Sequence, residues 1–165
     1  MKTRRLTQLA FLTTVALIIF VIELQLPNLV PIPGVKLGLA NIVTVYAVYR
    51  YRPGEAAMIL LSRILLGAFF GGQVVSLLYS LAGGTLCLCG MLFLRRILPE
   101  KYIWMCSILG AALHNIGQIT VAILIMQTIG LIAYLPVLML SGCIAGLFTG
   151  LCAQYLVNRK NLNEA

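Results

Sequence analysis

The stretch RYRPGEAAMILLSRILLGAFF, residues 50–70, holds the signals that decide the fold of this chain. It begins with two arginines and Pro53 and continues as an apolar segment that approaches the thickness of a bilayer core. Lys and Arg favour the cytoplasmic ends of membrane spans, and proline is tolerated in the first turn of a helix. We therefore expect a cytoplasmic turn at 50–54 and a transmembrane helix over residues 54–70.

The same pattern recurs along the whole chain. Ten of the twelve Lys and Arg residues fall in four clusters, which are Lys2/Arg4/Arg5, Arg50/Arg52, Arg95/Arg96/Lys101 and Arg159/Lys160. Each cluster is separated from the next by enough apolar chain to cross a bilayer twice. This spacing predicts an all-α, polytopic membrane protein with six spans and both termini in the cytoplasm. The expected spans of this single domain, 1–165, are 6–26, 39–49, 54–70, 74–94, 102–126 and 135–157.

Composition agrees with a membrane domain and narrows the function. The chain is 61% hydrophobic, its mean hydropathy is +1.03, and 165 residues leave no room for a separate soluble catalytic domain. The net charge of +8 follows from the cytoplasmic clusters, so we expect lipid contact and no nucleic-acid partner. With no aspartate and one histidine, the chain offers neither an Asp-rich magnesium site nor a catalytic triad. We expect a non-enzymatic protein of a bacterial cell membrane, without a metal or cofactor.

The second span is too short to cross a bilayer. Residues 39–49 rise about 16 Å as a helix, roughly half of a 30 Å core. The preceding segment, 27–38, holds three prolines and two glycines and cannot form a regular helix. Non-helical backbone survives at membrane depth only beside protein or a water-filled cavity. We expect this segment to enter the protein from outside and to wall a pocket.

Arg63 lies near the middle of the third span, where an unpaired arginine is unfavourable by roughly 2.5–3.5 kcal/mol. Two interpretations stay open. Arg63 has a structural role, as an ion pair with Glu23 near the outer end of the first span or as a snorkelling guanidinium, or it binds an anionic ligand at the floor of a cavity.

A second polar group is the motif LHNIGQ, which contains His114, Asn115 and Gln118. His114 and Gln118 are four residues apart and share a helix face with Gly110 and Gly117. One interhelical hydrogen bond would need fewer polar groups, so we favour pocket lining over a simple helix contact.

Lys36 and Asn41 flank the start of the second span, and alone Lys36 fits an interfacial lysine. Taken with Glu23, Gln73 and Gln118, however, the polar side chains fall mainly in the outer half of the spans. This asymmetry indicates a pocket that opens outward and favours anions.

The sixth span carries Gly142, Gly146 and Gly150 at four-residue spacing. Such stripes allow helices to pack closely. We expect this one to pack inside the bundle, with docking of a partner as the alternative.

The motifs PGVKLGLAN, residues 33–41, and LHNIGQ, residues 113–118, resemble those of the Gx transporter family, also labelled heptaprenyl diphosphate synthase component I. This family is in turn similar in size and span number to the S components of energy-coupling factor transporters. The resemblance implies a six-helix protein that captures a vitamin or another small polar or anionic solute outside the cell. It also implies partners, namely a transmembrane subunit and two ATPases, since this chain has no Walker motif.

Carried over by position, the resemblance implies that the candidate ligand contacts are Lys36, Asn41, Arg63, His114 and Gln118. We count Asn115 and Glu23 as further candidates. The other label implies an alternative function. The chain would then be a non-catalytic membrane subunit of a heptaprenyl diphosphate synthase complex, a role in isoprenoid and menaquinone biosynthesis.

Overall fold

The computed structural model describes residues 3–25, 38–71 and 74–164, with the side chains of residue 24 and residues 160–164 excepted. This part of the chain is helical and contains no β-strand, so the expected all-α class is confirmed. The six α-helices are α1 (Thr3–Leu24), α2 (Asn41–Arg50), α3 (Pro53–Gly71), α4 (Val74–Leu94), α5 (Ile103–Met126) and α6 (Leu135–Glu164). Two short 3-10 helices, η1 (Glu100–Tyr102) and η2 (Ile129–Tyr134), precede α5 and α6.

Five of these helical segments are long and apolar enough to cross a membrane. They cover Thr3–Glu23, Pro53–Gly71, Val74–Leu94, Glu100–Met126 and Ile129–Arg159. The exception is α2, whose ten residues rise about 15 Å. The fold is compatible with an integral, multi-pass membrane protein in which α2 covers only half of the bilayer core.

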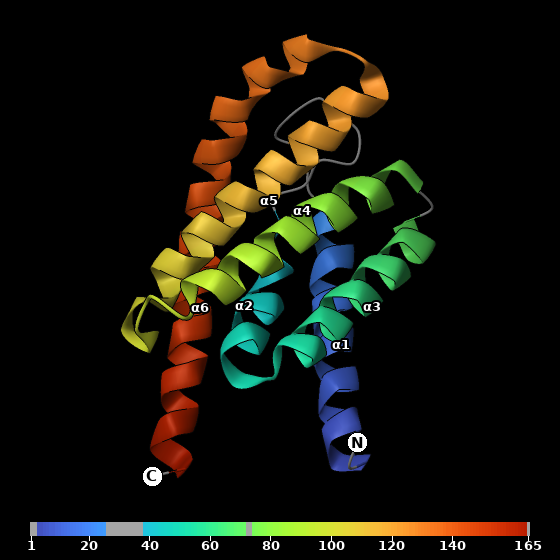
Figure 1. The fold of residues 1–165 in the computed structure, drawn as a ribbon. Coiled ribbons are helices and arrows are strands. Elements are labelled where there is room, and N and C mark those ends of the chain that lie inside the picture. Colours follow the sequence, from blue (N-terminus) through green and yellow to red (C-terminus); the bar gives the residue numbers. More distant parts are fainter. Residues whose placement is uncertain (1–2, 26–37, 72–73, 165) are drawn as a thin grey trace.

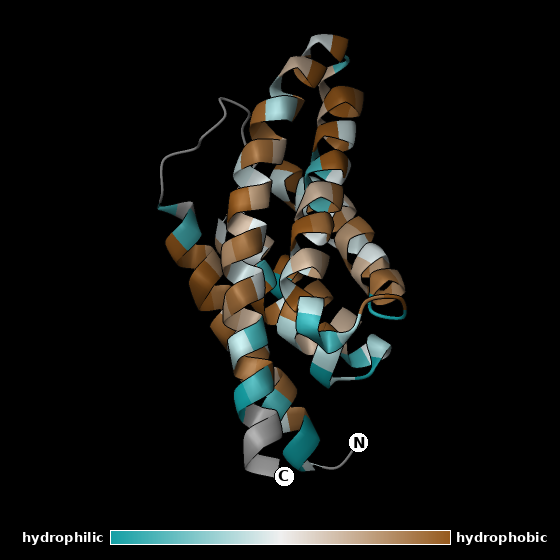
Figure 2. Cartoon of the chain, turned by 90° about the vertical axis from the view of Figure 1, so that its left-hand side faces the viewer, coloured by the Kyte–Doolittle hydropathy of each residue, from teal (hydrophilic) through white to brown (hydrophobic). Residues whose placement is uncertain are grey.

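The two termini lie at the same end of the bundle (Figure 1). The α2–α3 turn lies on the same side, whereas the α5–α6 turn is at the opposite end. Hydrophilic segments also gather toward the end that carries the termini (Figure 2). We call this the basic end, because Arg4, Arg50, Arg95 and Arg159 belong to the elements that meet there.

At the basic end, arginines hold the last turn of α2. Arg50 donates from Nη2 to the carbonyl of Val157 on α6, at 3.3 Å. Arg95, just beyond α4, donates from Nη1 to the carbonyl of Val48 and, at 3.4 Å, to that of Tyr51. The carbonyls at a helix C-terminus lack intrahelical partners and carry partial negative charge, which cations stabilise. The short helix is therefore fixed to both α4 and α6.

Helix α2 lies at the centre of the core. Most of its residues are buried, and its apolar side chains join a cluster that includes residues of α1, α3, α4, α5 and α6. A ten-residue helix is marginal by itself, so packing on all sides is what stabilises it. Helix α2 begins beside the last turn of α1, where the amide of Gly38 bonds to Glu23.

Glycines let α4, α5 and α6 approach closely. A Cβ atom on Gly117 would lie 2.8 Å from Gly83 Cα, and one on Gly83 would lie 2.7 Å from the carbonyl oxygen of His114. On α6, Cβ atoms on Gly146 and Gly150 would come within 2.9 Å and 2.7 Å of atoms on α5. The glycine stripe of α6 therefore faces α5, inside the bundle. The space beside Gly117 is filled by the backbone of α4.

Two expectations concern residues that the structure does not describe. The segment 27–38 is described only at Gly38, and Lys36 and Gln73 lie outside the described residues. The entry of this segment from outside and the ligand role of Lys36 stay predictions.

Candidate functional site

The carboxylate of Glu23 caps the start of α2. Glu23 is on the last turn of α1 and is only 4% exposed. Its Oε1 accepts a hydrogen bond from the amide of Gly38, and the amides of Leu39 and Ala40 also interact with the carboxylate. Amides at a helix N-terminus lack intrahelical partners and carry partial positive charge. The structure therefore gives Glu23 a structural contact that the sequence analysis did not predict.

Gly38 brings the start of α2 against α5. Its φ is +79°, a left-handed conformation that glycine adopts without steric strain. A Cβ atom on Gly38 would lie 3.0 Å from Asn41 Nδ2 and 4.0 Å from His114 Cδ2. The side chains of Asn41 and His114 therefore both lie next to the position that a side chain on this glycine would occupy.

His114 and Gln118 both face α4, as their four-residue spacing predicts. A Cβ atom on Gly83 would lie 3.1 Å from His114 Cε1 and 3.0 Å from Gln118 Cγ. His114 is 5% exposed and Gln118 only 1%. The absence of a side chain at Gly83 is thus what accommodates these two polar groups between α4 and α5.

Arg63 lies in the middle of α3 and is 5% exposed. Its charge interacts with Glu23, His114 and Cys87. Arg5–Glu55 is the one ion pair within the described residues, so Arg63 and Glu23 attract each other without a direct ion-pair contact. A buried guanidinium with a nearby carboxylate keeps its charge partly balanced and still has donors available to another anion.

One property that matters for binding is shared by the side chains of Asn41, Arg63, His114 and Gln118. Each is buried and has a polar atom without a hydrogen-bond partner in the described structure, namely Asn41 Oδ1, Arg63 Nε, His114 Nδ1 and Gln118 Oε1. Buried polar groups are hydrogen-bonded in the great majority of cases. Such orphaned atoms indicate places where a polar ligand or water completes the hydrogen bonds.

Two small cavities adjoin these residues. One is lined by Arg63, Phe20, Ser76 and Ser80, and the other by Gly38 and Asn41 with residues of α4, α5 and α6. Each has about 10 Å³ of free space, enough for one water molecule. Any larger ligand therefore needs the surrounding helices to move apart.

Asn115 is separated from this group. Its Nδ2 donates to the carbonyl of Leu138 on α6, and a Cβ atom on Gly142 would collide with the same Nδ2. Successive residues of a helix are rotated by about 100°, so Asn115 faces α6 while His114 faces α4. The structure therefore places Asn41 and His114 beside Gly38, and His114 and Gln118 beside Gly83. Arg63 is close enough to His114 and Glu23 for their charges to interact, and Asn115 is a tie between α5 and α6.

Two residues near the site were not predicted from the sequence. Gly83 provides the space for His114 and Gln118, and Tyr79, one turn away on α4, is fully buried with an unpartnered hydroxyl. A tyrosine within an apolar span was a visible polar signal for Tyr79. For Gly83 the sequence offered only one glycine among many.

Across the described ranges, no three His, Cys, Asp or Glu side chains group as metal ligands would. Cys87, whose thiol lies near Arg63, is a free cysteine and fully within the bundle. The arrangement is suited to holding an anion or a polar molecule by charge and hydrogen bonds.

Comparison with known proteins identifies the family. The sequence model of the family described as heptaprenyl diphosphate synthase component I matches residues 12–156, nearly the whole chain. Searches of curated proteins and of solved structures found no match. The matched range includes all of α2 to α5 and every residue of the buried polar group. The chain therefore belongs to the heptaprenyl diphosphate synthase component I family.

Proposed function

We propose that this protein is a membrane-embedded binding component that captures a small anionic or polar solute from the outer face of a bacterial cell membrane. One observation carries the proposal, which is the presence on three helices of four buried polar side chains, each with an unpaired polar atom. Arg63 supplies the positive charge, and Asn41, His114 and Gln118 supply directional hydrogen bonds. In this function the chain is no enzyme and carries no cofactor.

Binding requires an opening, and α1 is the element best suited to provide it. Of the five candidate spans, α1 is the least buried. Its Phe20 covers the cavity next to Arg63 and packs on Gly67, where a Cβ atom would lie 2.8 Å from the ring. Outward movement of α1 at Phe20 would therefore enlarge the cavity without disturbing the tight α4–α5–α6 packing. The solute would enter from the end of the bundle opposite the basic end.

By the similarity to S components, the energy for release would come from partners. We propose a transmembrane subunit and two ATPases of an energy-coupling factor transporter, with a vitamin or similar nutrient as the solute. Ala10 and Thr14, the small residues spaced four apart on α1, are both exposed and available to such a partner.

Native mass spectrometry of the gently purified, full-length protein tests this function. Wild-type protein should retain a water-soluble molecule, Arg63→Lys should retain less, and Arg63→Met should retain none. Lysine keeps the charge opposite Glu23 but cannot form a two-pronged contact with an anion. Arg96→Met is the matched control, because Arg96 is exposed at the end of α4. Wild-type protein without a retained solute, or equal retention in folded Arg63→Met, would contradict the proposal.

The name of the family favours a second candidate function. In this one, the chain is the non-catalytic membrane subunit of a heptaprenyl diphosphate synthase complex and assembles with a separate catalytic subunit. Arg63 would then balance the negative charge of a prenyl diphosphate. Retention of a polyprenyl diphosphate and co-purification of a prenyl synthase would favour this candidate over solute capture.

A further inference from the structure

A groove of about 620 Å³ lies at the basic end, away from the buried polar group. It is lined by Arg4, Thr7, Gln8, Phe11 and Leu12 of α1 and by Tyr46 and Tyr51. This volume lies within the range of about 300–1,000 Å³ that is typical of small-molecule sites. It is far larger than the two cavities beside Arg63.

The two arginines beside this groove differ in their partners. Arg5 is engaged, because its Nε and Nη2 donate to Glu55 at 2.9 and 2.8 Å and its guanidinium lies 4.6 Å from the centre of the Tyr51 ring. Arg4 is exposed, and no described carboxylate pairs with it. Among the described residues that line the groove, Arg4 is therefore the one free positive charge.

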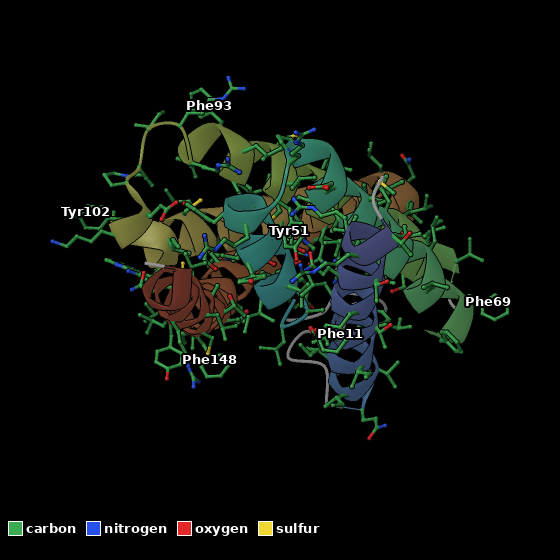
Figure 3. The ribbon with its side chains drawn as sticks, turned by 90° about the horizontal axis from the view of Figure 1, so that it is seen from below. Phe11, Tyr51, Phe69, Phe93, Tyr102 and Phe148 are labelled. Atoms are coloured by element: carbon green, nitrogen blue, oxygen red, sulfur yellow. The ribbon has the colours of Figure 1, made fainter. Side chains whose placement is uncertain are left out.

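The walls beside Arg4 are apolar and accessible. Phe11 is 67% exposed, and Leu12 and Tyr46 are partly exposed. Seen from the basic end, Tyr51 lies centrally between α1 and α2, and Phe11 lies on α1 (Figure 3). Phe69 and Phe148 project outward at the periphery in the same view, as lipid-facing side chains do. The groove thus joins a cation at the membrane surface to an apolar wall at lipid depth.

We propose that this groove binds one anionic phospholipid, with its phosphate on Arg4 and an acyl chain along Phe11, Leu12 and Tyr46. Basic pockets between helices at the cytoplasmic side are suited to anionic head groups. The single free cation among the described lining residues matches one phosphodiester better than a diphosphate, whose larger charge calls for several cations. A partner helix fits less well, since residues 4–12 of α1 offer an apolar wall only about 12 Å long. This inference is independent of the proposed solute site.

Native mass spectrometry with added lipid tests the site on the full-length protein. The protein is mixed with equal amounts of phosphatidylglycerol and phosphatidylcholine that carry the same acyl chains, and the fraction of protein with each bound lipid is measured. Wild-type protein should retain phosphatidylglycerol preferentially. Arg4→Gln should weaken this retention about fivefold, the effect of one cation near an anionic head group. Arg96→Gln removes a different exposed cation at the basic end and should retain the lipid as the wild type does.

A second variant tests the apolar wall. Thr7→Trp keeps every charge, but its indole would fill the groove, so this variant should lose phosphatidylglycerol while circular dichroism shows an unchanged helix content. Three results would overturn the proposal. These are equal retention of the two lipids by the wild type, equal loss in the Arg4→Gln and Arg96→Gln variants, and displacement of phosphatidylglycerol by an equimolar prenyl diphosphate.

Discussion

Gly83 and His114 are in such close contact that a methyl group on Gly83 would lie 2.7 Å from the His114 carbonyl oxygen and 3.1 Å from Cε1 of its ring. The contact fixes both the crossing of α4 over α5 and the position of the imidazole. Because one of the two neighbours is backbone, a side chain at Gly83 cannot be accommodated by a rotamer change alone.

Gly83→Ala should therefore destabilise the protein by about 1–3 kcal/mol, the usual effect of overpacking a tight interface. Thermal unfolding in detergent, followed by circular dichroism, measures this loss. Gly54→Ala is the matched control, because a Cβ atom there has nothing within 4 Å. Gly54→Ala should leave the melting temperature unchanged or slightly higher. Equal melting temperatures for the two variants would contradict the described α4–α5 contact.

The cap of α2 predicts a localised effect at Glu23. Glu23→Ala leaves the partly buried amide of Gly38 without its acceptor, which should destabilise the protein by about 1–3 kcal/mol. Glu23→Gln keeps an acceptor and should have a smaller effect. Hydrogen exchange should rise at residues 38–40 in Glu23→Ala and stay slow at the C-terminal end of α2. Glu100→Ala, which changes an exposed glutamate in η1, is the control. Unchanged exchange at 38–40 would show that Glu23 does not cap this helix.

The two-pronged contact of Arg5 with Glu55 predicts that lysine cannot replace this arginine. Arg5→Lys should lower the melting temperature, because an ammonium group cannot form both bonds and also lie flat on the Tyr51 ring. Arg4→Lys, one residue away and without such partners, should leave it unchanged. High salt should reduce the difference between the two variants, because this pair is partly exposed. A salt-independent difference would assign the effect to packing instead.

Substitutions at Asn115 and Gln118 distinguish an effect on helix packing from an effect on solute binding. Asn115→Leu removes the bond to the Leu138 carbonyl and crowds Gly142, so it should lower the melting temperature. Its affinity for the retained solute should match that of the wild type, in contrast to Gln118→Leu, which changes a side chain of the buried polar group. Isothermal titration of both folded variants makes the comparison. Loss of affinity in Asn115→Leu alone would place the ligand between α5 and α6.

Helix boundaries were largely predictable from the sequence. The predicted span 74–94 coincides with α4, and the predicted span 54–70 is one residue shorter than α3 at each end. The predicted span 102–126 begins one residue before α5 and ends with it. Clustered arginines and apolar length decide these boundaries, and both are visible in the sequence. The sixth helix begins at residue 135 as expected but continues to Glu164. Its polar final turns need no apolar run, because helical hydrogen bonds form equally well in polar sequence.

The buried polar group was predictable only in part. Charge and hydrogen-bonding capacity within apolar spans drew attention to Arg63, His114 and Gln118. The direction in which each side chain points depends on how the helices are rotated, and hydropathy does not fix this rotation. Asn115 therefore faces α6 although its neighbour His114 faces α4, and Glu23 meets the start of α2 instead of a ligand.

The measurement that tests the central claim most directly is an experimental structure of the protein purified with its retained solute. The proposed function predicts density for a molecule larger than water between Arg63, Asn41, His114 and Gln118, with α1 moved outward at Phe20. Each orphaned polar atom should then have a partner on that molecule. A structure in which these side chains surround a single water molecule, and in which the solute is bound elsewhere, would contradict the proposed binding site.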